Sequence, residues 1–252
     1  MINTLRSEWT KLTTTKSFWW TTALFLIISL GFAAMTGSLA TGDSMASLFL
    51  FAGNTVTGLY LLGFVVLMIQ ATMIFTTEFR YGYQSQTFLA TPKRWVVALA
   101  KWLLYVVLAA ALTFVTVLLC FYLAKALASD VASSTLVVWE DKQALAIMWK
   151  YPVAAALMVT LCSGVALLVR QTAGAVSLVL MWHFALENLL SFLPKVGESV
   201  GKYGPFTNLR SFITEYQTID PGWSTNTGAV YFAAWAVVLF VAGIIVQERR
   251  DA

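Results

Sequence analysis

The sequence WVVALAKWLLYVVLAAALTFVTVLLCFYLA, residues 95–124, contains a single charged side chain, Lys101. A helix needs about 20 predominantly apolar residues to cross the hydrocarbon core of a bilayer. This run is longer than one crossing needs, so we expect its ends to tilt or to extend into the interface. Apolar and polar residues do not alternate in it, which favours a helix over a membrane strand.

The composition of the whole chain agrees with this run. The 252 residues are 59% hydrophobic and only 11% charged, whereas soluble domains are about 25% charged. Ten Trp and seventeen Phe residues give more apolar surface than one water-soluble core could bury. Cys120 and Cys162 both lie in apolar runs, so no disulfide framework is expected. The net charge of +4 is small and spread out, and we expect a lipid bilayer as partner and no nucleic acid.

Five further runs are long enough to cross a bilayer. The six predicted spans are 18–39, 54–76, 95–124, 151–169, 173–193 and 228–247. Only residues 170–172 separate the fourth span from the fifth, which predicts a tight helical hairpin. The first run exceeds the roughly 7–15 apolar residues of a signal peptide, so we expect it to be retained. The sequence therefore predicts an all-α membrane protein with six transmembrane helices.

The distribution of Lys and Arg predicts the orientation of these spans. If the N-terminus is cytoplasmic, ten of the sixteen basic residues lie on the inner side, with only four of the twelve acidic ones. The inner basic residues are then Arg6, Lys11, Lys16, Arg80, Lys93, Arg94, Lys101, Arg170, Arg249 and Arg250. Positive residues are enriched on the cytoplasmic side of membrane proteins. We therefore expect both termini in the cytoplasm of a multi-pass protein of the plasma (inner) membrane.

The N-terminal stretch has helical periodicity of its own. Ile2, Leu5, Trp9 and Leu12 follow one another at spacings of three, four and three, and polar residues occupy the remaining surface. This pattern predicts an amphipathic helix lying in the headgroup plane, with Trp9 and Lys16 as anchors. A frayed polar leader is the alternative.

The stretch TTEFRYGYQSQTFLATPKRW, residues 76–95, is a polar, aromatic-rich segment between two spans. Thr76 or Thr77 is expected to cap a short helix with Glu78 in its first turn, and Pro92 to end it. Aromatic residues mixed with a few charges are typical of a protein–protein contact. An inner loop whose aromatic residues belong to the interfacial belt is the alternative, and composition does not separate the two.

Three stretches together resemble the membrane subunit of ABC transporters of the ABC-2 type, particularly small bacterial permeases. The first is LRSEWTKLTTTKSFWW (5–20), and the second is TEFRYGYQSQTFLATPKRWVVALAK (77–101). The third is SGVALLVRQTAGAVSLVLMW with the adjoining WHFALENLL (163–190). They occur in the family's order and extend the resemblance across nearly the whole chain.

The resemblance implies roles for the polar segments. Residues 1–17 would contain an elbow helix with Leu5, Trp9 and Leu12 on its apolar face, ahead of a six-helix domain at 18–252. Residues 77–91 would form a cytoplasmic coupling helix that docks on a separate ATPase subunit. The implied contact residues are Glu78, Phe79, Arg80, Tyr83, Thr87 and Phe88. Two ATPase copies would bind ATP and Mg, and a second, identical permease subunit would complete the transporter.

The sequence contains no ATP site of its own. The nearest phosphate-loop pattern is GESVGK at 197–202, where the glycines have the wrong spacing and no Ser or Thr follows Lys202. We therefore expect no cofactor on this chain and no enzymatic activity, with ATP hydrolysis on the partner.

The fifth span contains the only histidine, His183, and an acid, Glu187, four residues later. Ionisable groups at such depth usually face a cavity or one another. A polar contact between helices, a place on a transport path and a catalytic pair are all compatible with this spacing. Because a zinc site needs at least three protein ligands, a metal site is not expected.

Two outer loops have amphipathic patterns. In the loop at 194–227, Phe206, Leu209, Phe212, Ile213 and Tyr216 recur at helical spacing after Pro205, which predicts short helices. The resemblance implies that they are re-entrant and extracellular. In the loop at 125–150, residues 139–149 predict a small amphipathic helix on the outer surface. Gly164, Ala173 and Gly174 permit close helix packing, within one subunit or between two.

The resemblance implies the membrane subunit of an exporter, and the apolar and aromatic spans would suit an amphipathic or hydrophobic cargo (drug, peptide or lipid). A self-sufficient secondary transporter, a non-transporting membrane anchor or sensor, and an intramembrane enzyme at His183 and Glu187 remain alternatives. Few charges lie within the spans for proton or sodium coupling, which disfavours the secondary transporter.

Overall fold

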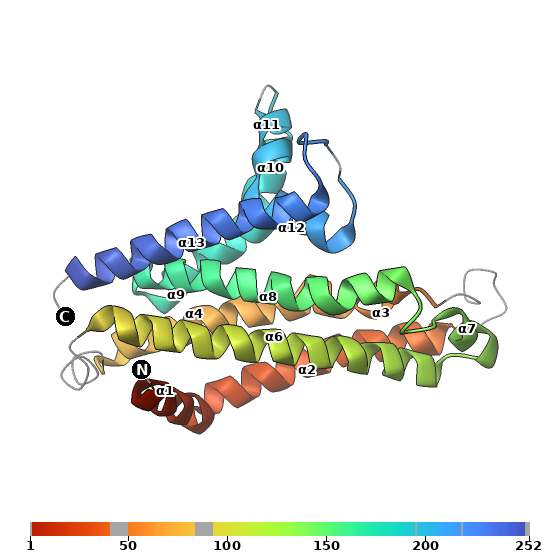
Figure 1. Cartoon of the computed structure of the whole chain (residues 1–252), viewed down its shortest axis with the longest axis horizontal. Coiled ribbons are helices and arrows are strands. Elements are labelled where there is room, and N and C mark those ends of the chain that lie inside the picture. Colours follow the sequence, from red (N-terminus) through yellow and green to blue (C-terminus); the bar gives the residue numbers. More distant parts are fainter. Residues whose placement is uncertain (1, 41–49, 84–92, 195, 218, 250–252) are drawn as a thin grey trace. The chain divides into compact units, whose positions relative to one another are not determined.

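The computed structural model describes residues 2–40, 50–83, 93–194, 196–217 and 219–249. Within these ranges the protein is all-helical, without a strand (Figure 1). The helices are α1 (Ile2–Thr14), α2 (Lys16–Leu39), α3 (Ala52–Thr55), η2 (Leu59–Gly63), α4 (Phe64–Tyr81), α6 (Arg94–Leu127), α7 (Asp130–Thr135), α8 (Lys142–Val169), α9 (Thr172–Met181), η3 (Trp182–Leu186), α10 (Glu187–Ser191), α11 (Gly197–Tyr203), α12 (Pro205–Thr214) and α13 (Thr225–Arg249). The segments η2 and η3 are π-helical turns.

Six of these helical stretches are long and apolar enough to cross a membrane, which confirms the predicted number. They are Lys16–Leu39, Leu59–Tyr81, Arg94–Leu127, Lys142–Val169, Thr172–Ser191 and Thr225–Arg249. The third has 34 residues and exceeds one crossing, as expected. The tight hairpin is also present, because α8 ends at Val169 and α9 begins at Thr172.

The fourth span begins earlier than predicted. Residues 142–149, expected as part of a separate amphipathic helix, form the first two turns of α8, which continues through Pro152. The predicted start of the span, residue 151, is adjacent to this proline, which lacks an N–H and is disfavoured in a helix interior. Membrane helices tolerate such a residue when neighbouring groups satisfy the freed carbonyl.

The chain divides into two compact units. The first comprises residues 1–14, 68–107 and 156–252, and the second comprises 15–67 and 108–155. In the first unit, the buried side chains of Phe75, Ala98, Ala166, Leu167 and Phe240 form a hydrophobic cluster. This cluster joins α4, α6, α8 and α13.

Close helix packing in the first unit occurs at Gly164, within one subunit. An added Cβ on Gly164 would lie 2.6 Å from backbone atoms of Leu239 and Phe240. The backbones of α8 and α13 therefore touch at this point, as small residues permit in membrane helices. The neighbouring Ala173 is exposed.

In the second unit, α2 packs against η2 and the C-terminal part of α6. The Sγ atom of Cys120 donates to the carbonyl oxygen of Ser29 at 3.5 Å, and the ring of Phe64 contacts that of Tyr151 at 5.6 Å. Both cysteines are buried and free, as the sequence predicted.

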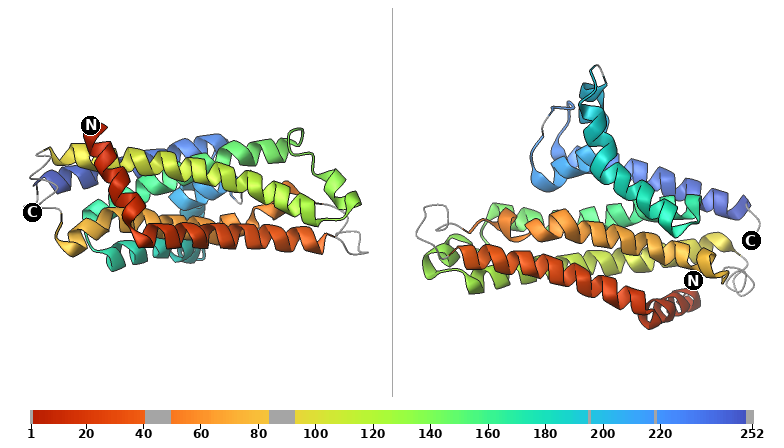
Figure 2. Two further views of the ribbon diagram at one scale, coloured as in Figure 1. Left: turned by 90° about the horizontal axis from the view of Figure 1, so that it is seen from below. Right: turned by 180° about the vertical axis from the view of Figure 1, so that it is seen from behind.

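The helices expected in the loop after the fifth span are present as α11 and α12. Figure 2 (right panel) shows α10 and α11 projecting beyond α12, with the chain returning through α12 to α13. Pro205 occupies the first turn of α12, where its missing N–H costs no hydrogen bond. Phe206, Leu209, Phe212 and Ile213 are buried on one side of this helix.

Candidate functional site: a four-charge cluster on α1, α4 and α6

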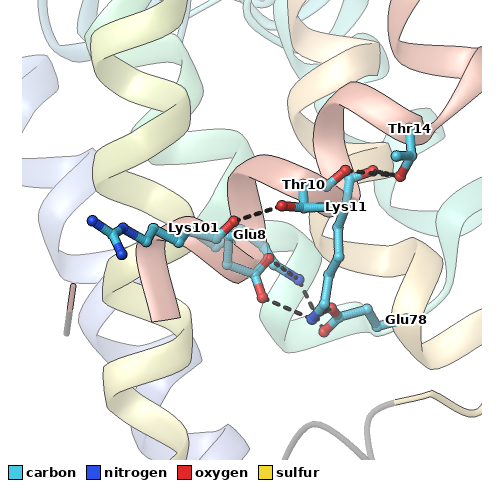
Figure 3. Close-up of polar contacts among 7 residues, drawn as sticks. Glu8, Thr10, Lys11, Thr14, Glu78 and Lys101 are labelled. Atoms are coloured by element: carbon cyan, nitrogen blue, oxygen red, sulfur yellow. Dashed lines mark hydrogen bonds and ion pairs between the residues drawn. The ribbon is translucent and has the colours of Figure 1, made fainter. Parts of the chain in front are cut away.

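Four charged side chains from three helices of the first unit meet in one cluster (Figure 3). Lys11 on α1 lies 2.8 Å from a carboxylate oxygen of Glu8 and 2.8 Å from one of Glu78 on α4. Lys101 on α6 contacts the second oxygen of Glu78 at 2.9 Å and that of Glu8 at 3.6 Å. Each cation therefore contacts both acids. Two acids and two bases make the cluster electrically neutral, and we call it the four-charge cluster.

The four-charge cluster is largely removed from solvent. The side chains of Glu8 and Lys101 are 4% and 6% exposed, and that of Glu78 is 16% exposed, whereas Lys11 is 41% exposed. Removing one partner of a buried ion pair costs about 3–5 kcal/mol, because the other charge is left uncompensated. The balance of charges is therefore a condition for burying them together.

Lys11 is held in its charged form by this environment. Burial opposes the charge, but hydrogen bonds from the ammonium to Glu78 and Glu8 outweigh it and raise the pKa of Lys11. A raised pKa means that the contribution of Lys11 is complete at neutral pH. It is lost only as the pH rises through that raised pKa.

The side of helix α1 that packs on the protein contains an acid, Glu8. Glu8 and Leu12 are its buried residues and Leu5 is half-buried, while Ile2 and Trp9 are 69% and 48% exposed. Glu8 follows Leu5 by three residues and precedes Leu12 by four, so it shares their side of the helix. The spacing of Glu8 relative to Leu5 and Leu12 thus indicates which side of the helix it occupies. Its burial was not predicted, because an acid is rarely buried. Figure 2 (left panel) shows α1 crossing the ends of α4 and α6.

The predicted short helix beginning at Thr76 or Thr77 is wrong. Both threonines lie inside α4, where their hydroxyls donate to the carbonyl oxygens of residues 72 and 73. Glu78 consequently lies in the last turn of a span, and not in the first turn of a coupling helix. The hydroxyl of a helical threonine can bond back to the preceding turn, so it need not act as a cap.

Helix α4 ends in a defined turn. Gly82 has φ of +73°, and the N–H of Tyr83 donates to the carbonyl oxygen of Glu78 at 3.1 Å. This is the Schellman arrangement, in which a glycine adopts the left-handed conformation that closes a helix. The chain thus leaves α4 three residues after the four-charge cluster.

The predicted ATPase-contact residues fall into three groups. Glu78 is ion-paired, and the ring of Phe79 lies 5.1 Å below the Arg170 guanidinium. Arg80 and Tyr83 are exposed, together with Tyr81, which lies 5.6 Å from the Arg80 guanidinium. Thr87 and Phe88 lie outside the described residues. Only Arg80 and Tyr83 of the described set are therefore available to a partner, and we call residues 80–83 the exposed turn.

Glu187 belongs to a second polar network in the first unit. Its carboxylate accepts hydrogen bonds from the indole N–H of Trp182 at 2.9 Å and from the backbone N–H groups of Phe206 and Thr207 at 2.9 and 2.7 Å. The Thr207 hydroxyl donates a fourth, at 2.8 Å. A carboxylate at the positive N-terminus of α12 stabilises that helix. The arrangement indicates a structural contact between α10 and α12.

His183 does not share this network. Its ring contacts those of Phe184 and Phe206, with centroids 4.8 and 5.0 Å away, and its Nδ1 atom has no hydrogen-bond partner in the described part of the chain. His183 lies within the π-turn η3, and Glu187 follows this turn as the first residue of α10. No group of three His, Cys, Asp or Glu side chains in the described ranges could hold a metal ion.

Comparison with known proteins adds no relative: no model of a protein family matches the chain, and a search of curated proteins finds no match.

Proposed function

We propose that this chain is the membrane subunit of an ATP-driven exporter of the ABC-2 type in the plasma (inner) membrane. Two copies of it would associate with two copies of a separate ATPase subunit that binds ATP and Mg. Both termini would face the cytoplasm, with α1 as the elbow helix and α11 and α12 as re-entrant extracellular helices. The cargo would be amphipathic or hydrophobic.

The observation that carries this proposal is the end of α4. The exposed turn offers a cation and two aromatic rings, a composition typical of protein contacts, on a helix whose last turn is ion-paired to α1 and α6. A partner that pushes on such a turn would move three helices together. A loop serving only as a connector would need no such bracing.

The ionisable groups of the spans favour an external energy source. The carboxylates of Glu78 and Glu187 are each held by several donors. A secondary transporter uses intramembrane carboxylates to bind and release protons or sodium. Both of these side chains are instead engaged in joining helices.

The test is affinity purification of the chain from its native membrane in mild detergent, followed by mass spectrometry of the proteins that accompany it. The variant replaces Arg80 and Tyr83 with Ala. Its matched control replaces Arg210 and Tyr216, an exposed Arg and Tyr near the end of α12. All three proteins should be recovered in equal amounts.

We expect an ATPase subunit with the wild type and with the control, and its depletion from the R80A/Y83A variant. Equal recovery of the ATPase with both variants would show that the ATPase does not bind at the exposed turn. Absence of any ATPase, under conditions that preserve other such complexes, would contradict the exporter and favour a secondary transporter or a membrane anchor.

A further inference from the structure

The four-charge cluster divides into two neutral halves along the boundary between α1 and the helices it rests on. Glu8 and Lys11 belong to α1, are three residues apart and are 2.8 Å from each other. Glu78 and Lys101 belong to α4 and α6 and are 2.9 Å from each other. If α1 moved away, each half would keep an ion pair. No buried charge would be left alone, and an uncompensated charge is what makes breaking a buried pair costly.

Little apolar surface holds α1 in place. Leu12 is its only buried apolar side chain, and Glu8 is the other buried residue. Leu5 is half-buried, and Ile2 and Trp9 are 69% and 48% exposed. The contact of α1 with α4 and α6 therefore includes two ion pairs that cross it, Lys11–Glu78 and Lys101–Glu8, beside a small apolar surface.

The chain also provides a hinge. Thr15 separates α1 from α2 and has extended backbone angles, with φ of −85° and ψ of 116°. The division between the two compact units falls between Thr14 and Thr15. A single non-helical residue at an element boundary is the kind of position that absorbs a change of backbone angle.

We propose that α1 is a detachable latch on the last turn of α4. In the docked state its charges fix Glu78 and, through it, the exposed turn. In the released state α1 carries its own ion pair away, and Glu78 remains paired with Lys101. The latch concerns this chain alone and would regulate the exposed turn whatever partner binds there, so it can be tested without the proposed ATPase.

The test compares double variants of the full-length protein in detergent micelles that each remove one acid and one base, so all have the same net charge. Glu8→Gln with Lys11→Gln removes the pair on α1, and Glu78→Gln with Lys101→Gln removes the pair beneath it. Glu8→Gln with Lys101→Gln is the matched control. It leaves Lys11–Glu78, and detachment of α1 would now strand both charges. Hydrogen–deuterium exchange of residues 2–14 reports docking, and thermal unfolding reports the fold.

In the wild type, the amides of α1 should share one protection factor well below that of α4 and α6, as expected for a helix that opens as a unit. The two same-side variants, E8Q/K11Q and E78Q/K101Q, each remove a pair from one side of the boundary. Both should raise the exchange rate of the α1 amides by about tenfold and leave the protection of α4 and α6 unchanged. In the control, E8Q/K101Q, the α1 amides should exchange more slowly than in either same-side variant. Similar exchange in all three double variants, or exchange of α1 equal to that of α4 in the wild type, would overturn the latch. A same-side variant that lost the protection of α4 and α6 would contradict it as well, since neutral halves should separate without unfolding.

Discussion

At the scale of single residues, Glu187 illustrates how an intramembrane acid can be structural. Its four hydrogen bonds come from Trp182, Phe206 and Thr207, and two of the donors are backbone N–H groups in the first turn of α12. Such groups have no partner within their own helix and need one when buried. The acid of one helix thus caps the start of another.

Replacing Glu187 with Ala should therefore destabilise the protein by about 3 kcal/mol, because buried donors lose their acceptor. Gln keeps one acceptor oxygen and should cost less. Thermal unfolding in detergent measures both. The control is Glu198→Gln on α11, where the ion pair with Lys202 is solvent-exposed and no measurable change is expected. Equal effects of E187A and E198Q would contradict the capping role.

Arg170 is a residue with a conformation unusual for its type. It has φ of +58°, a left-handed value that only glycine adopts without cost. Its guanidinium donates to the carbonyl oxygen of Gln247 at 3.4 Å and lies over Phe79. The side chain thus connects the end of α13 with the end of α4, and the backbone conformation ends α8.

Two substitutions separate these contributions. Arg170→Ala and Arg170→Gly remove the same contacts, but only Gly removes the backbone strain. We expect the Gly variant to be more stable than the Ala variant by about 1 kcal/mol. The melting temperatures of the two variants in the same detergent measure this difference in stability. Identical values would mean that the backbone of the turn relaxes when the Arg170 side chain is removed.

At the scale of elements, α8 and α13 contact each other through backbone. An added Cβ on Gly164 would lie 2.6 Å from the Phe240 nitrogen, and one on Gly243 would lie 2.9 Å from the Gly164 oxygen. Two helices this close gain dispersion contacts along their length. Three members of the hydrophobic cluster, Ala166, Leu167 and Phe240, lie on the same pair of helices.

Gly164→Ala should separate α8 from α13 and cost about 1–3 kcal/mol, the usual range for overpacking a close contact. Gly31→Ala in α2 is the matched control, since a Cβ there meets nothing within 4 Å. Ala in a helix interior should be neutral or slightly stabilising at that position. Urea or thermal unfolding of both variants measures the difference, and a neutral G164A would show that the contact adjusts without strain.

At the scale of the whole molecule, crossing of the membrane by all six long apolar helices would place α1 and the end of α13 on the same side. The distribution of basic residues predicts that this side is cytoplasmic. Ser7 on α1 and Tyr216 after α12 are both exposed and would then lie on opposite sides. The two native cysteines are buried and do not interfere with thiol labelling.

In intact cells, a membrane-impermeant maleimide should therefore label Tyr216→Cys, whereas Ser7→Cys should react only after permeabilisation. The wild type supplies the background of the buried cysteines. Labelling of Ser7→Cys from outside would reverse the predicted orientation, and labelling of both variants from outside would contradict six crossings.

The number and approximate position of the spans could be read from the sequence because they depend on a local property. A run of about 20 apolar residues has little alternative to a membrane helix. The hairpin at 170–172 and the short helices after Pro205 followed from local pattern in the same way. Where local signals compete, as at Pro152 and Thr76, the predicted boundaries were wrong.

Only the tertiary structure decided which polar residues meet. Lys11 and Glu78 are 67 positions apart, and Glu187 lies 20 positions before Thr207. Pairing at such distance depends on how helices cross, which hydrophobic periodicity does not specify. The sequence by itself determined that this chain has six helices long and apolar enough to cross a membrane. Helix packing decided that Glu8, an ordinary acid in an amphipathic pattern, is buried. The charge of Glu8 can be buried because packing brings Lys101 and Lys11 to it, and their charges offset the cost of removing it from water.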